Sequence, residues 1–165
     1  MKYRQLGRTD LEVSLICLGS RTWGRQCSES EAHQQLDYAI SKGVNFIDSA
    51  EIYPSLPDAE SYGRCEQIIG SWIKKRGDRQ KIIIATKVAG HSRRLPYIRD
   101  GDIRLDRKNI NAAVDASLKR LQTDYIDLYQ THWPDRDTNC LGQLGYFHVP
   151  EKDLTAIEET LEALN

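Results

Sequence analysis

The sequence predicts an α/β fold in which a short β-hairpin precedes four strand–helix units. Two observations predict it. Four apolar runs rich in β-branched residues alternate, along the 165 residues, with four stretches whose apolar residues recur at helical spacing. The runs are apolar on both faces, which is typical of parallel strands covered by helices. We therefore expect the order βαβαβαβα after the hairpin.

The hairpin and the strands follow from the positions of the apolar runs and the turn residues between them. Residues 1–13 form the expected hairpin, as two short extended pieces on either side of a turn at residues 7–10. Residues 14–165 then supply the four strand–helix units. The predicted strands are residues 13–19, 44–49, 81–87 and 125–132.

The four helical patterns have recognisable ends. The first begins at a Ser-x-x-Glu capping box at residues 28–31 and ends at Gly43. The second ends at Gly77, and the third begins near Asp106. The fourth carries Leu154 and is still periodic where the chain ends. Four such units are half of a (β/α)8 TIM barrel, which needs about 250 residues. We therefore expect the chain to represent the N-terminal half of that barrel.

The connections are long at one end of the predicted strands and short at the other. The long loops, which follow strands, are residues 53–62, 88–106 and 133–150. The short returns, which precede strands, are residues 42–43, 77–80 and 122–124. Long loops in compact domains are usually functional, and the loops after the strands form the active face of a TIM barrel. The asymmetry predicts chemistry at the carboxyl ends of the strands.

One group of basic residues lies in and just after the loop of residues 88–106. Acidic residues interleave with it, so we interpret the segment as a solvated mixed-charge loop rather than a phosphate site. The basic residues are Arg93, Arg94, Arg99, Arg104, Arg107 and Lys108.

The composition argues against several classes of function. Lys plus Arg number 23 and Asp plus Glu number 24, a formal net charge of −1, which does not favour binding to nucleic acid or to a membrane surface. No apolar run approaches the roughly 18 residues that span a bilayer. Because no apolar stretch of signal-peptide length follows residues 1–4, we expect no secretory signal. The cysteines at positions 17, 27, 65 and 140 lack metal-ligand spacing. We expect free thiols, no metal and a cytoplasmic location.

Three successive predicted strands end in an ionisable residue. Asp48 ends the second strand, Lys87 the third and His132 the fourth, and Tyr53 lies five residues beyond Asp48. Singly, each has an ordinary structural explanation, such as a turn-forming aspartate or a solvated lysine. Together they match the layout of a catalytic barrel, whose active residues lie at the carboxyl ends of several strands.

The four side chains form a coherent proton-donating group. A tyrosine hydroxyl, with a pKa of about 10 in peptides, is a weak acid, and a nearby ammonium lowers that pKa. Lys87 would need a carboxylate partner, which Asp48 can supply. His132 can donate a hydrogen bond to a substrate oxygen. These roles suit reduction of a carbonyl group, for which a nicotinamide cofactor would have to bring the hydride.

The chain resembles the aldo-keto reductases, most closely their Tas-like NADP(H)-dependent branch. The resemblance runs from Tyr3 to the last residue and is carried by YRQLGRTDLEVSLICLG, GVNFIDSAEIYP, IIIATKV, LDRKNINAAVDASLKRLQTDYIDLYQTHWPDR and TNCLGQLGY. It implies an eight-stranded α/β barrel whose base is closed by an N-terminal hairpin. It also implies reduction of an aldehyde or ketone with NADPH.

The resemblance assigns roles to individual residues. The family's catalytic tetrad matches Asp48, Tyr53, Lys87 and His132, with tyrosine as general acid and base. Its Gly-x-x-x-Trp-Gly segment, which lies beside nicotinamide and substrate, matches residues 19–24. The resemblance thus implies that Gly19 and Trp23 of this segment, together with Asp48 of the tetrad, bind the cofactor.

Two alternatives stay open at this stage. One is a non-catalytic binding or regulatory protein on the same fold, as in the potassium-channel β subunits of the family. The other is an inactive truncated fragment, because most of the family's cofactor contacts come from the second half of the barrel. An open half-barrel would also expose strand edges, through which copies of the chain could self-associate.

Overall fold

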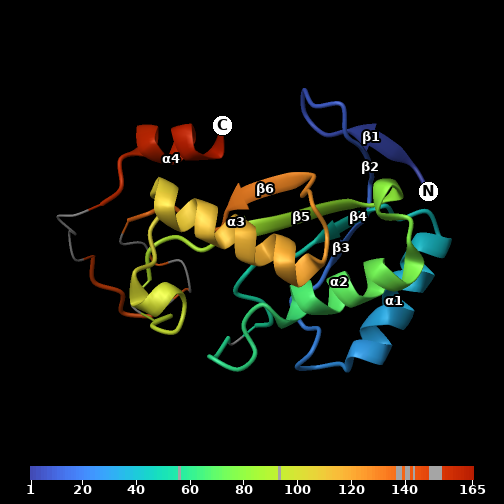
Figure 1. Cartoon of the computed structure of the whole chain (residues 1–165), viewed down its shortest axis with the longest axis horizontal. Helices are drawn as coiled ribbons and strands as arrows, with labels where there is room; N and C mark the ends of the chain where they lie inside the picture. Colours follow the sequence, from blue (N-terminus) through green and yellow to red (C-terminus); the bar gives the residue numbers. More distant parts are fainter. Residues whose placement is uncertain (56, 93, 137–138, 140–141, 143, 149–153) are drawn as a thin grey trace.

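The computed structural model contains a four-stranded parallel sheet whose outer face is covered by helices (Figure 1). The structure describes residues 1–55, 57–92, 94–136, 139, 142, 144–148 and 154–165. The sheet has the order β3-β4-β5-β6, with β3 (Cys17–Gly19), β4 (Phe46–Asp48), β5 (Ile83–Val88) and β6 (Leu128–Thr131). The helices are α1 (Glu29–Ser41), α2 (Arg64–Arg76), α3 (Arg107–Leu121) and α4 (Ile157–Leu164). Strands and helices alternate as predicted.

A two-stranded antiparallel hairpin, β1 (Tyr3–Gln5) and β2 (Glu12–Ser14), precedes the sheet. Asn45, just before β4, holds the hairpin at the amino ends of the strands: its side chain accepts from Ser14 N at 2.7 Å and donates to Glu12 O at 2.9 Å. In Figure 1 the loops after β5 and β6 lie at the other end of the sheet.

The predicted strand at residues 13–19 is divided between the two sheets. Its first residues belong to β2 and its last three to β3, because the chain bends at Leu15 and Ile16. The Ser14 hydroxyl donates to the Ile16 carbonyl at 2.6 Å, and the side chains of Leu15 and Ile16 are exposed. Because residues 13–19 are apolar almost throughout, the sequence pattern does not show that the chain passes from one sheet to the other within them.

The helix ends follow local sequence chemistry. Ser28 and Glu31 form the predicted capping box at the start of α1. α2 begins and ends at glycines in the left-handed conformation, Gly63 and Gly77. Asp106 caps α3 by accepting a hydrogen bond from Asn109 N at 2.7 Å.

Strand alternation separates the sheet into two unlike faces. On the face toward the helices, Ile47 and Ile84 are fully buried in one core with Leu36 and Trp72. On the opposite face, which we call the inner face, Phe46, Ile83 and Leu128 are only half-buried. The inner face is the one that would line a closed barrel.

The last predicted strand and helix both begin later than expected. β6 starts at Leu128 rather than at residue 125, because Asp127 bends the chain: its carboxylate accepts from Ile84 N at 2.9 Å and from Arg79 at 2.6 Å. Strand alternation through residues 125–132 would place Ile126 on the inner face with Leu128, but Ile126 packs instead against the core under the helices.

α4 starts at Ile157, so Leu154 lies outside the helix, and Ala163 packs against the core under α3. The Thr160 hydroxyl at the middle of α4 donates to the Leu105 carbonyl at 2.8 Å. None of the helices in the described part of the chain is long and apolar enough to cross a membrane.

Candidate active site

Asp48 and Lys87 meet at the carboxyl ends of β4 and β5, on the inner face. The Lys87 ammonium donates to both Asp48 oxygens, at 2.6 and 2.7 Å, and to the Ser49 carbonyl at 2.6 Å. Three acceptors satisfy all three ammonium hydrogens. The register of the strands places Asp48 opposite Ala85, two residues before Lys87 on β5. The side chains of Asp48 and Lys87 therefore leave the same face of the sheet.

Tyr53 follows in the loop after β4 and lies beside this ion pair. The Lys87 ammonium is 5.3 Å from the centre of its ring. A hydrogen bond from Tyr53 N to Ala50 O, 3.1 Å long, closes a turn just after the end of β4. The ring packs between two cores while the residue stays half-buried.

His132 completes the group from the end of β6. Its ring lies edge-on to Tyr53, with the ring centres 5.5 Å apart, and it also contacts Trp133. Its backbone N donates to Val88 O at 2.8 Å, which extends the pairing of β6 with β5. The Nδ1 atom is buried and has no hydrogen-bond partner among the described residues. The structure thus brings together all four predicted catalytic residues.

The environment keeps both rings of this group uncharged at neutral pH. Burial lowers the pKa of His132 to about 4, and Lys87 acts in the same direction. Burial and, second, the Asp48 charge raise the pKa of the Tyr53 hydroxyl above its usual value, while Arg21 acts in the opposite direction. A neutral imidazole still has one N–H to donate, and a protonated phenol still has its proton.

The expected lowering of the Tyr53 pKa by Lys87 is wrong for this geometry. Burial and, second, the Asp48 carboxylate raise the Tyr53 pKa, and the cation that acts in the opposite direction is Arg21. The Lys87 ammonium is engaged by both Asp48 oxygens and by the Ser49 carbonyl.

The predicted cofactor residues after β3 separate into two groups. Gly19 is exposed at the strand end opposite Asp48, with no atom within 4 Å of where a Cβ would lie. Trp23 is 1% exposed and its indole donates to Gln35 at 2.9 Å. Gly19 thus leaves open space beside the Asp48 carboxylate, whereas Trp23 anchors the loop from within the core.

Sequence reasoning missed a buried ion pair next to the tetrad. Glu51, 1% exposed, accepts two hydrogen bonds from Arg99, at 2.7 and 3.1 Å. The interpretation of the segment as a solvated mixed-charge loop is therefore wrong for Arg99, whose side chain is mostly buried against Glu51. The other described members fit it better, since Arg104 and Lys108 pair with the exposed Asp102. Arg93 and Cys140 lie outside the described residues.

A second missed feature is Arg21, which is exposed on the loop after β3. Ser55 N donates to the Arg21 carbonyl at 2.8 Å, so the loops after β3 and β4 are joined there. The positive charge of Arg21 acts to lower the pKa of both Tyr53 and His132. Within the described part of the chain, no group of three or more His, Cys, Asp or Glu residues is placed to hold a metal ion.

Parallel βα units with an ionisable tetrad at their carboxyl ends define a barrel-type enzyme site, and comparison with known proteins gives the family. The sequence pattern of the Aldo/keto reductase family matches residues 15–165. The chain belongs to this family of oxidoreductases.

The relatives agree with this assignment. The chain is 50% identical over 164 residues, 99% of its length, to the protein tas of Escherichia coli, of which it covers 47%. It is 35% identical over its whole length to a probable voltage-gated potassium channel subunit beta of Arabidopsis thaliana, of which it covers 42%. It thus spans about half the length of these curated relatives.

A solved structure gives the same picture. An aldo-keto reductase from Bacillus halodurans in its holo form superposes with a TM-score of 0.70 at 35% identity, covering 99% of this chain and 45% of that one. The predicted fold, the N-terminal half of an aldo-keto reductase barrel, is confirmed by this match.

Proposed function

We propose that this chain carries the catalytic half of an NADPH-dependent reductase that converts an aldehyde or ketone to an alcohol, with Tyr53 as the proton donor. The observation that supports it most is the convergence of Tyr53 and His132 beside the Asp48–Lys87 ion pair, at one end of the sheet. Family membership supports the oxidoreductase class.

The residues divide the work as follows. Tyr53 gives its hydroxyl proton to the carbonyl oxygen as carbon–oxygen bond order falls, and neutral His132 donates a hydrogen bond that orients the same oxygen. Lys87 and Asp48 hold the local field and geometry. NADPH, when bound, supplies the hydride that balances the proton.

The residues present fit the nicotinamide end of that cofactor. Open space above Gly19 would give a flat ring access to the strand end, where Gly19 lies opposite Asp48. The Ser20 and Ser49 hydroxyls, buried at the same strand ends, have no partner among the described residues. Arg21, on the loop after β3, is an exposed cation.

A second candidate function is regulatory binding without turnover. The match of the whole chain to 42% of a probable channel subunit beta favours it, because a related protein carries that name. For the isolated 165 residues we further propose self-association through the inner face and its strand edges. A cytoplasmic setting is supported by the free thiols of Cys17, Cys27 and Cys65.

The test is a matched pair of tyrosine variants in a protein that includes this chain within a closed barrel. Tyr53→Phe should lower kcat for aldehyde reduction by about 10²–10⁴-fold, the usual contribution of general acid catalysis. Tyr129→Phe is the control, because it also deletes one hydroxyl. That hydroxyl is buried on the helix side of the sheet and has no hydrogen-bond partner in the described part of the chain.

NADPH affinity should be unchanged in both variants, as measured by fluorescence titration. Wild-type activity in Tyr53→Phe would remove Tyr53 as the donor. Absence of turnover in the wild type, with NADPH still bound, would favour the regulatory function.

A further inference from the structure

We propose that Glu51, held by Arg99, is the positioning residue that sets Lys87 against Asp48 and Tyr53. The inference deepens the proposed function and rests on it for its effect on rate. Glu51 lies between Asp48 and Tyr53 in the sequence, and it is nearly fully buried. It contacts the backbone of the Lys87 strand at Lys87 itself and at Ala89, two residues further on.

The contacts of Glu51 hold the backbone at the end of β5, from the Lys87 carbonyl to the Ala89 amide. Glu51 N donates to the Lys87 carbonyl at 3.2 Å, and the Glu51 Oε1 accepts from Ala89 N at 2.6 Å. The first bond continues the parallel pairing of Ser49 N with Ala85 O beyond the end of β4. The second replaces a ladder bond with a side chain. Together they fix the position along the strand at which the Lys87 side chain leaves the sheet.

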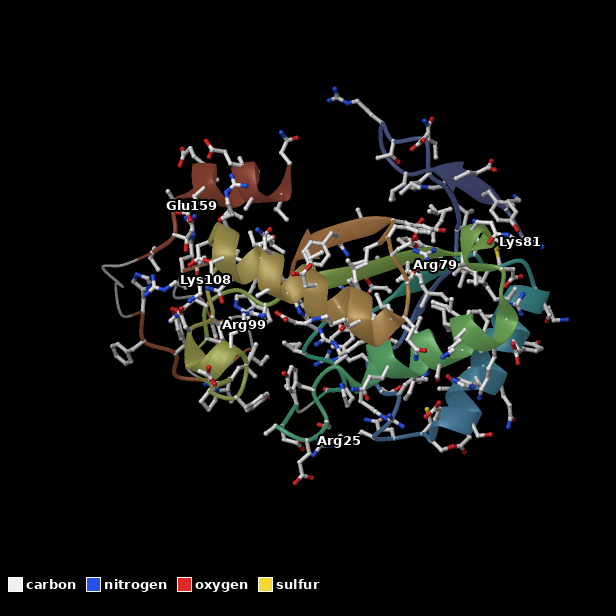
Figure 2. All side chains as sticks on the ribbon, viewed as in Figure 1. Arg25, Arg79, Lys81, Arg99, Lys108 and Glu159 are labelled. Atoms are coloured by element: carbon white, nitrogen blue, oxygen red, sulfur yellow. The ribbon has the colours of Figure 1, made fainter. Side chains whose placement is uncertain are left out.

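Arg99 makes this arrangement rigid from the other side. Its guanidinium donates to both Glu51 oxygens, at 2.7 and 3.1 Å, and its Nε donates to the Asn109 side chain at 2.8 Å. Asn109 is in turn bound by Asp106, the cap of α3. Figure 2 shows Arg99 at the end of the sheet opposite Arg79 and Lys81.

Backbone geometry also shows that Arg99 is held in place. Arg99 and Asp100 have φ angles of 46° and 55°, a left-handed conformation that costs free energy in residues other than glycine. Such a conformation persists only where surrounding contacts enforce it. The loop after β5 is therefore tied to the site through one ion pair.

A second buried Glu–Arg pair gives the matched control. Glu66 on α2 is fully buried, accepts from Arg120 Nε on α3 at 2.6 Å and from the Thr86 hydroxyl at 2.6 Å. Thr86 points to the helix side of β5, so this pair joins helices to the sheet without contacting the tetrad. The two pairs have the same chemistry and nearly the same burial, and they differ in which face of β5 they support.

The experiment compares Glu51→Gln with Glu66→Gln. To avoid leaving a buried arginine unpaired, the double variants Glu51→Gln/Arg99→Gln and Glu66→Gln/Arg120→Gln accompany them. A 1 Å displacement of a catalytic group can cost about 100-fold in rate. We therefore expect kcat to fall roughly 10- to 100-fold in the Glu51 variants, with KM and NADPH affinity unchanged. Folded Glu66 variants should keep the wild-type kcat.

A second readout does not depend on activity. The ε-methylene NMR signal of Lys87, assigned with Lys87→Arg, should shift in the Glu51 variants and stay in place in the Glu66 variants. If the wild type reduces no aldehyde, the proposed function fails while this signal still tests the positioning role. Wild-type kcat in the folded Glu51 double variant, or an unmoved Lys87 signal, would overturn the inference.

Discussion

The two faces of the same four strands have opposite character. Ile84 and Ile83 are neighbours on β5, yet Ile84 is completely buried under the helices while Ile83 is half-exposed on the inner face. The helix side carries the larger apolar core, and the inner face carries the Asp48–Lys87 ion pair beside apolar side chains that are only half-buried. Period-two alternation thus lets one strand contribute stability on one side and chemistry on the other.

This separation explains why the four tetrad residues are brought together in a chain that spans about half the length of its relatives. The strand ends are placed by contacts on the helix side, such as the Glu66 pair, and by the ladder bonds themselves. The inner face adds little packing. Changes on the two faces should therefore have different consequences.

The largest expected effect on stability comes from the helix side. In the 165-residue chain, Ile84→Ala should lower the free energy of unfolding by about 2–5 kcal/mol, the usual cost of truncating a buried isoleucine. Ile83→Ala should cost clearly less, because its side chain keeps part of its water contact. Equal losses in urea unfolding would mean that something covers the inner face.

The Asp48–Lys87 pair should come next. Lys87→Met leaves a carboxylate unmatched, which costs roughly 3–5 kcal/mol when fully buried. Asp48 is 32% exposed at its side chain, so we expect a loss below that range. Adding Asp48→Asn should recover part of it. If the losses from the two substitutions simply added, the two groups would not be acting as one electrostatic unit.

His132 should make the fold sensitive to acid. Its pKa is about 4 in the folded chain against 6.5 normally, so the unfolded state binds the proton first as pH falls. The contribution is complete above about pH 6.5 and is lost toward pH 4, at most about 3 kcal/mol. His132→Gln should flatten this part of the stability profile. If the difference in free energy of unfolding between His132→Gln and the wild type were the same at every pH in that range, the ring would not be buried in its neutral form.

The smallest effect concerns association of the isolated chain. Ile83→Lys places a charge on the inner face and should shift light scattering of the 165 residues toward the monomer. Tyr38→Lys, at an exposed position on α1, is the control and should change nothing. A wild-type chain that is monomeric at every concentration would refute self-association.

Local rules predicted the strand-end positions of the tetrad well. Asp48 and Lys87 were placed on one face by alternation and at one end by the parallel order, and both rules depend on nearby residues alone. The Glu51–Arg99 pair joins positions 48 residues apart. Nothing local distinguishes such a buried charge from a solvated one. The same limit hid the bend at Asp127, which depends on Arg79.

The most direct test of the account is the pH dependence of carbonyl reduction by a closed barrel that includes this chain. Tyr53 must be protonated to act as the acid, and its pKa lies above the usual 10. The rate of the chemical step should therefore stay level through neutral pH and fall only above about pH 10. That alkaline fall should vanish in Tyr53→Phe. A fall centred near neutrality, or one that persists in Tyr53→Phe, would show that another group gives the proton.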